Sequence, residues 1–195
     1  MNVNIVLFDD FETLDAFGAA QIFGKAPEYF YLKYLSVKGG VINSSQGVKV
    51  WTEPLEAESI KDILVIPGGR GARKLLHMEQ ESLKLFKKSA ERADICMMIE
   101  NGSAIVAQTG LLYHRQVADY EYDDNWKRMF TAGFVRIPKI RWMADGKYYS
   151  CSTSAASLDM ALSIVADNID IDVAEKIAKE IGYTWDPENE EGILR

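Results

Sequence analysis

Two segments of the sequence constrain the fold most. Residues 94–112 have the pattern of an apolar strand, a sharp turn at Glu100-Asn101-Gly102 and a helix that ends near Gly110. A strand that turns directly into a helix lifts the side chain at the apex above the sheet and directs backbone N–H groups toward it. Residues 64–69 (LVIPGG) have the pattern of a second buried strand, ended by a glycine turn. The sequence therefore predicts an elbow-type site with Glu100 at its apex.

Strand-like and helix-like segments alternate along the rest of the chain. Strands are expected at residues 3–8, 29–37, 62–66 and 115–118, hairpins at 39–51 and 141–150, and helices at 14–23, 79–92, 123–130, 154–167 and 172–181. Such alternation is typical of an α/β domain with a doubly wound, mostly parallel sheet flanked by helices, in which ligands bind beyond the carboxyl ends of the strands. We expect one domain that spans residues 1–195.

The charge and cysteine content exclude several classes of function. A formal net charge of −7 and a pI near 5.0 argue against a nucleic-acid surface. The first residues carry neither the basic start of a signal peptide nor a membrane-length apolar run. The two cysteines, Cys96 and Cys151, show no pairing signature, which favours the reducing cytoplasm. With only two histidines, the sequence has no metal-ligand spacing, and it indicates no cofactor.

Four motifs along nearly the whole chain resemble those of the ThiJ/PfpI superfamily and follow the same order. They lie at residues 8–18, at 62–69, at 101–112, and at 145–147 with 158–162. The nearest branch is similar to isonitrile hydratases and to the amidase-like domains of some transcription regulators. The resemblance implies a flavodoxin-like sandwich of the class I glutamine amidotransferase type. It also implies a homodimer and a small-molecule ligand that the sequence does not identify.

In the family that this chain resembles, the elbow apex carries a reactive cysteine, and a histidine often follows the elbow helix. The cysteine position corresponds to Glu100 here, and the histidine position corresponds to Tyr120. The resemblance therefore implies a site of the family's shape without the groups that supply thiolate chemistry.

The other site residues follow from the same comparison of motifs. The family acid that touches the apex corresponds to Asp15, which could also be the N-terminal cap or a first-turn acid of the helix expected at 14–23. Backbone N–H groups of Gly68 and Gly69, with that of Asn101 after the apex, correspond to the oxyanion donors. Tyr120, Cys151 and Arg70 are candidates for the lining of a pocket.

Two interpretations of Glu100 are open. With Asp15 it could act as a carboxylate base or nucleophile on a small amide, isonitrile or carbonyl compound. Alternatively, its carboxylate fills the oxyanion site and closes it, so that the protein binds a small molecule or a partner without catalysis. We expect the two acids to lie within hydrogen-bond reach and to share one proton.

The remaining reactive side chains have plainer interpretations. Cys151 could be a displaced thiol, but a small residue packed where a strand meets a helix is the simpler hypothesis, and Cys96 belongs to an apolar run. His77 and His114 are expected near the surface, where neither completes a Ser-His-Asp triad.

Overall fold

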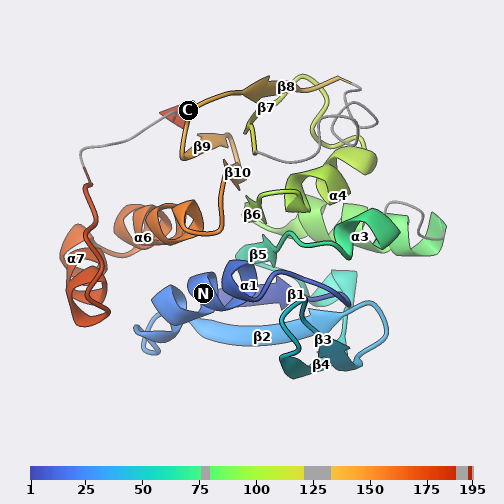
Figure 1. The fold of residues 1–195 in the computed structure, drawn as a ribbon, viewed down its shortest axis with the longest axis horizontal. Helices are drawn as coiled ribbons and strands as arrows, with labels where there is room; N and C mark the ends of the chain where they lie inside the picture. The colour runs from blue at the N-terminus through green and yellow to red at the C-terminus, as the bar shows by residue number, and fades with distance from the viewer. Residues whose placement is uncertain (76–79, 121–132, 188–192, 195) are drawn as a thin grey trace.

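The computed structural model describes residues 1–75, 80–120, 133–187 and 193–194, and Figure 1 shows the chain as a ribbon. Nine strands form one sheet in the order β11-β9-β10-β6-β5-β1-β2-β4-β3. Their bounds are β1 Asn2–Val6, β2 Tyr31–Ser36, β3 Gly40–Asn43, β4 Lys49–Pro54, β5 Ile63–Ile66, β6 Ile95–Ile99, β9 Trp142–Asp145, β10 Tyr148–Cys151 and β11 Ile193–Leu194. A separate parallel pair is formed by β7 (Gln116–Ala118) and β8 (Val135–Ile137).

The central part of the sheet is parallel, and a hairpin flanks it on each side. Strands β10, β6, β5, β1, β2 and β4 pair in parallel. The β3–β4 and β9–β10 hairpins pair antiparallel, and Gly146 adopts a φ of +59° in the turn of the second hairpin. The chain winds outward from β1 to β4 and then crosses back to β5, so the sheet is doubly wound, as the alternation of elements predicts.

Helices cover both faces of the sheet. They are α1 (Thr13–Gly24), α2 (Ala72–Leu75), α3 (Gln80–Arg92), α4 (Gly102–Gln108), α6 (Ala156–Asn168) and α7 (Ile171–Glu180), with a 3-10 turn at Ala57–Ser59. Helix α6 contacts α1 and α7, and α4 contacts α2 and α3. Figure 1 shows α6 and α7 to the left of β5 and β6, and α3 and α4 to their right. Among the described residues, no helix has the length and apolar character needed to cross a membrane.

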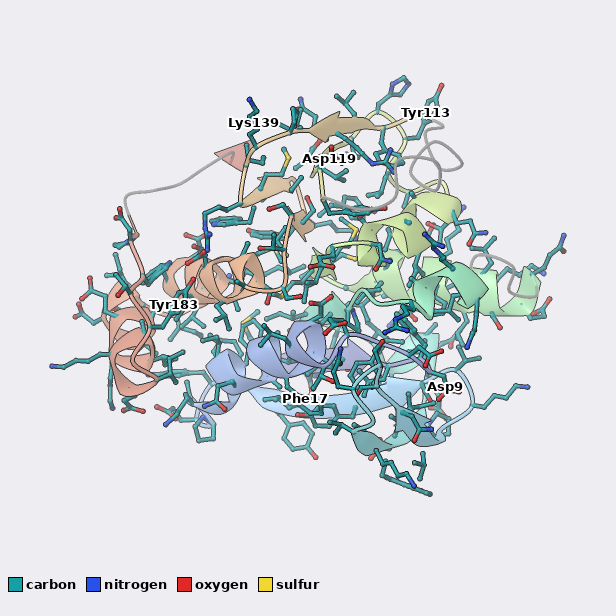
Figure 2. The ribbon with its side chains drawn as sticks, in the orientation of Figure 1. Asp9, Phe17, Tyr113, Asp119, Lys139 and Tyr183 are labelled. Carbon is teal, nitrogen blue, oxygen red and sulfur yellow. The ribbon has the colours of Figure 1, made fainter. Side chains whose placement is uncertain are left out.

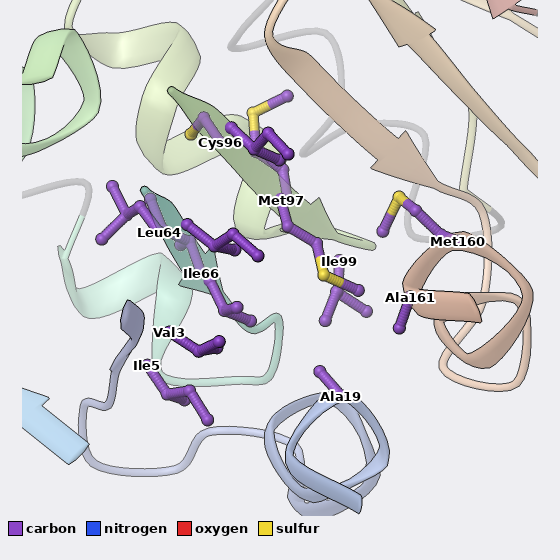
Figure 3. Close-up of a cluster of buried hydrophobic side chains, with 14 of the residues drawn as sticks. Val3, Ile5, Ala19, Leu64, Ile66, Cys96, Met97, Ile99, Met160 and Ala161 are labelled. Carbon is purple, nitrogen blue, oxygen red and sulfur yellow. The ribbon is translucent and has the colours of Figure 1, made fainter. Parts of the chain in front are cut away.

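The core lies where the central strands meet these helices. All residues of β5 and of β6 are buried, as expected for strands covered on both faces. In Figure 3, the side chains of Ile99 from β6, Ala19 from α1 and Ala161 from α6 point toward one another. Each is completely buried, so the short alanine side chains allow both helices to approach the sheet.

The elbow after β6 has the expected geometry. Glu100 adopts a φ of +47°, a left-handed conformation that non-glycine residues adopt rarely. Gly102 begins α4 against the end of β5, where a Cβ atom would lie 2.4 Å from the carbonyl oxygen of Ile66. The strain at Glu100 and the missing side chain at Gly102 together place the apex above the carboxyl ends of β5 and β6.

Some elements differ from the expectation. Strands β8 and β11 and the short helix α2 were not expected from the sequence. Segments this short carry little periodicity, although the equally short β7 was expected at 115–118. Helix α6 begins at Ala156 and therefore leaves Ser154 in the loop that precedes it. The helix expected at 123–130 lies outside the described residues.

Replacement of Gly102 tests the elbow packing. Because a Cβ atom would clash with the backbone oxygens of Ile66 and Pro67, at 2.4 and 2.9 Å, Gly102→Val should lower the free energy of unfolding by about 1–3 kcal/mol. Urea denaturation measures the change. Gly24→Ala is the matched control, because its Cβ would meet only Leu32 at 3.9 Å. Equal stability of Gly102→Val and the parent would contradict the elbow.

Candidate functional site

The loops after β1 and β5 are joined by backbone contacts beside the elbow. The N–H of Glu12 donates to the carbonyl oxygen of Gly68 at 2.8 Å, and Phe11 forms an antiparallel bridge with Gly69. A Cβ atom on Gly69 would lie 2.5 Å from the carbonyl oxygen of Asp10, so only glycine fits there. These contacts fix the start of α1 against the turn that follows β5.

Asp15 lies in the first turn of α1 and is completely buried. Its Oδ2 atom accepts a hydrogen bond of 2.8 Å from the N–H of Gly68, whereas Oδ1 is buried with no hydrogen-bond partner. The N-cap of α1 is Glu12, so the prediction that Asp15 caps this helix is wrong, whereas the alternative prediction of a first-turn acid is confirmed. The carboxyl group instead holds the glycine turn of the neighbouring loop.

Asn101 ties the same turn to the elbow. Its side-chain Oδ1 accepts from the N–H of Gly69 at 2.8 Å, and its Nδ2 donates to the Gly69 carbonyl oxygen at 3.0 Å. The N–H groups of Gly68 and Gly69, implied as oxyanion donors, are therefore both engaged by side chains of the protein. The role of the Asn101 side chain was missed by sequence reasoning, which considered only its backbone.

The apex carboxylate of Glu100 is directed to the loop before α6. Its Oε1 atom accepts hydrogen bonds from the N–H of Ser154 at 2.9 Å and from the Ser154 hydroxyl at 3.1 Å. The expected hydrogen bond between Glu100 and Asp15 is not formed, since Asp15 Oδ1 has no partner and Oδ2 is bonded to Gly68. The sequence signal for Ser154 was weak, because the helix was expected to start at that residue.

The two acids nevertheless influence each other. Burial, reinforced by the charge of Glu100, raises the pKa of Asp15 to about 7, although nearby donors of Ser154 and Gly68 lower it. Burial also raises the pKa of Glu100, with a smaller contribution from Glu12, while the Ser154 donors lower it. Glu100 is only half-buried and has two donors, so the negative charge is more favourable on Glu100 and the proton on Asp15.

Neither cysteine is an activated thiol. Cys151 is buried, and its Sγ contacts the carbonyl oxygen of Thr153 at 3.5 Å. Burial, followed by the charge of Asp15, raises the pKa of Cys151 well above its usual value. Burial likewise raises the pKa of Cys96 to about 12. The structure therefore supports the interpretation of Cys151 as a packed residue and not as a displaced nucleophile.

Tyr120 lines a pocket of about 360 Å³ together with two residues of the loop that precedes Ser154. The lining residues are Asp119, Tyr120, Pro138, Lys139, Ile140, Arg141, Ser152 and Thr153. Figure 2 labels Asp119 and Lys139 near β7 and β8, at one end of the molecule. Burial raises the pKa of Tyr120 to about 12, with Arg136 lowering it and the charges of Asp119 and Glu100 raising it. At neutral pH the phenol is therefore uncharged.

The other candidates that the structure describes are exposed. Arg70 is exposed, and its charge acts on Asp10. His114 is exposed and contacts the ring of Tyr113. His77 lies outside the described residues. Within the ranges that the structure describes, no group of three or more His, Cys, Asp or Glu residues could hold a metal ion.

The chain belongs to the DJ-1/PfpI family, whose sequence model matches residues 1–167. An isonitrile hydratase of Pseudomonas putida is 25% identical over 195 residues, which cover 98% of this chain and 82% of the hydratase. This confirms the resemblance to the ThiJ/PfpI superfamily.

Solved structures show the same fold. A ThiJ/PfpI family protein from Pseudomonas syringae superposes with a TM-score of 0.82 at 20% identity, over 95% of this chain and 76% of that protein. An AraC family transcriptional regulator from Pseudomonas putida superposes with a TM-score of 0.78 at 17% identity, over 92% of this chain and 98% of that structure. The fold is the flavodoxin-like, class I glutamine amidotransferase-like sandwich.

Thiol labelling tests the buried state of both cysteines. Because burial raises the pKa of Cys96 and of Cys151, neither forms appreciable thiolate near neutral pH. We expect iodoacetamide to leave the folded protein unmodified at about pH 7.5 and to label both residues in denaturant, as followed by mass spectrometry. Rapid labelling of Cys151 in the folded protein would restore the displaced-thiol hypothesis.

The negative charges of Glu100 and Asp15 predict that the effect of Glu100→Gln on stability depends on pH. The raised pKa of Asp15 means that folded protein binds a proton that unfolded protein releases, so this contribution to stability is complete below about pH 4 and is lost as pH rises through about 7. Glutamine removes the like charge and keeps an acceptor for Ser154. The variant should match the parent near pH 5 and exceed it by about 1 kcal/mol near pH 8.

Urea denaturation at several pH values measures this difference. Glu28→Gln is the matched control, because it makes the same substitution at an exposed position outside the site. A stability difference between Glu100→Gln and the parent that is independent of pH would contradict the coupling of the two acids.

Proposed function

We propose that this protein is a DJ-1/PfpI family member that has lost catalysis and binds a small molecule or a protein partner. The observation that carries the proposal is the binding of the Glu100 carboxylate to Ser154 at the apex of the elbow. The resemblance implies a cysteine at this position, and the two described cysteines are buried with raised pKa values. The chain therefore lacks an accessible thiolate.

The backbone donors support the same proposal. An oxyanion site requires N–H groups that are free to bind developing charge. Here the N–H groups of Gly68 and Gly69 already donate to Asp15 and to Asn101. An oxyanion at the apex would have to displace both side chains, at the cost of two buried hydrogen bonds. The pocket beside Tyr120, of about 360 Å³, is large enough to hold a small ligand.

A second function rests on the two acids. A hydrolase or hydratase that acts on a small amide, isonitrile or carbonyl compound could use Glu100 as base and Asp15 as acid. The pKa of Asp15, raised to about 7 by burial and by Glu100, is suited to proton transfer near neutral pH. The similarity to the isonitrile hydratase of Pseudomonas putida also favours this alternative.

The homodimer and the cytoplasmic location stay predictions.

Turnover assays separate the two functions. With small isonitriles and amides as substrates, the wild-type protein should show only the uncatalysed rate, because the apex lacks a thiolate and the loop donors are engaged. Glu100→Cys should gain little activity, since Tyr120 stands where the family often has a histidine. Product formation is followed by chromatography, with the folded state of each variant checked by circular dichroism.

The outcome that would contradict the proposal is turnover by the wild-type protein that is abolished in Glu100→Gln while the fold is kept. That result would assign the catalytic role to the carboxylate.

A further inference from the structure

The Glu100 carboxylate is bound by two donors of the loop that precedes α6. The N–H and the hydroxyl of Ser154 converge on one oxygen, at 2.9 and 3.1 Å. Thr153 Oγ1 accepts from the N–H of Ala156 at 3.2 Å, which ties this loop to the start of α6. The thirteen-residue helix that follows adds the positive end of its dipole. Donors arranged in this way bind carboxylates in general.

The buried carboxyl group of Asp15 gives a second indication of a ligand beside the Ser154 donors. Its Oδ1 atom is fully buried with no hydrogen-bond partner, although buried polar atoms are nearly always paired. The charge of Glu100 acts on this carboxyl group, so the two side chains lie close together. A neutral Asp15 offers one O–H donor, which a carboxylate bound next to Ser154 could accept.

The site also has space beside it. Glu100 is half-buried, so its side chain has solvent on one side. Ser152 and Thr153, which immediately precede Ser154, line the pocket of about 360 Å³. Pro138 and Ile140 supply apolar surface in the same pocket. A short apolar chain would fit there with its polar end toward the loop before α6.

We propose that the donors of Ser154 form a receptor for small monocarboxylates, which the protein's own Glu100 occupies in the resting state. An external monocarboxylate binds in its place when the Glu100 side chain is removed or turns outward. This inference rests on the proposed function, in which Ser154 holds the Glu100 carboxylate at the apex and the site binds a ligand without catalysis. It adds the chemical class of the ligand, which is an anion with one carboxylate and a small apolar body.

Removal of the Glu100 side chain tests the receptor directly, with sodium acetate as the probe. Glycine accepts the φ of +47° without strain, so Glu100→Gly should fold. Acetate should raise the melting temperature of Glu100→Gly with the logarithm of its concentration above Kd, by about 3–5 °C at tenfold excess over Kd, relative to sodium chloride at equal ionic strength. Wild-type protein and Glu100→Gln should shift by less than about 1 °C, because their own side chain fills the site.

A double variant identifies the donors. Glu100→Gly combined with Ser154→Ala lacks the hydroxyl and should bind acetate at least about fivefold more weakly, which corresponds to the loss of one hydrogen bond to a charged group. Isothermal titration of acetate into folded Glu100→Gly is the second measurement of the same binding. Absence of acetate binding by the folded variant that lacks the Glu100 side chain would overturn the proposal.

Two further results would also overturn it: an equal shift in wild-type protein, or an unchanged affinity after Ser154→Ala. Failure of the proposed function is distinguishable from these results. It would appear as turnover of isonitriles or amides by wild-type protein, a measurement in which acetate binding plays no part.

Discussion

The close approach between the start of α4 and the end of β5 is the constraint on which the site depends. Gly102 has no side chain to separate the helix from the carbonyl oxygen of Ile66. Gly68 is similarly confined, because a Cβ atom there would lie 2.5 Å from Asn101 Oδ1 and 2.9 Å from Asp15 Oδ2. The turn after β5, the start of α1 and the start of α4 therefore lie in close contact. Glu100 is left at the apex with a strained φ. The geometry is kept whether or not the apex residue reacts.

Electrostatics then decides what the apex does. Ionisation of both carboxyl groups in a largely buried site costs free energy, and the pKa of each group is raised mainly by burial. The donors of Ser154 favour the negative charge on Glu100, while Asp15 holds the turn through Gly68. The same acids raise the pKa of the nearby Cys151 thiol, after burial as the main cause, so a thiolate is disfavoured where negative charge already exists.

Much of the fold could be predicted from the sequence because its periodicity is strong. The apolar run at β6 and the amphipathic pattern of α3 extend over whole elements, whereas β8 and β11 are too short to produce a pattern. The elbow was predictable from Glu100-Asn101-Gly102 directly after a buried strand. Its position over the sheet follows from the parallel order of the central strands.

The contacts within the site were less predictable, because they join residues far apart in the chain. The pairing of the Asn101 amide with the peptide of Gly69 depends on how the two loops meet. The bond from Ser154 to Glu100 depends on α6 starting two residues later than its pattern suggests. Asp15 was recognised as a site residue from the family motif, and its first-turn position alone would have favoured a role at the helix terminus.

The central claim is that the Glu100 carboxylate is held by Ser154 next to a protonated Asp15. NMR titration of the carboxyl carbons of Glu100 and Asp15, recorded together with the Ser154 amide resonance, tests it most directly. The account predicts that both carboxyl groups titrate above their usual range and that the Ser154 amide shift follows the titration of Glu100. Ordinary pKa values near 4 for both acids, with a Ser154 amide that does not respond, would contradict it.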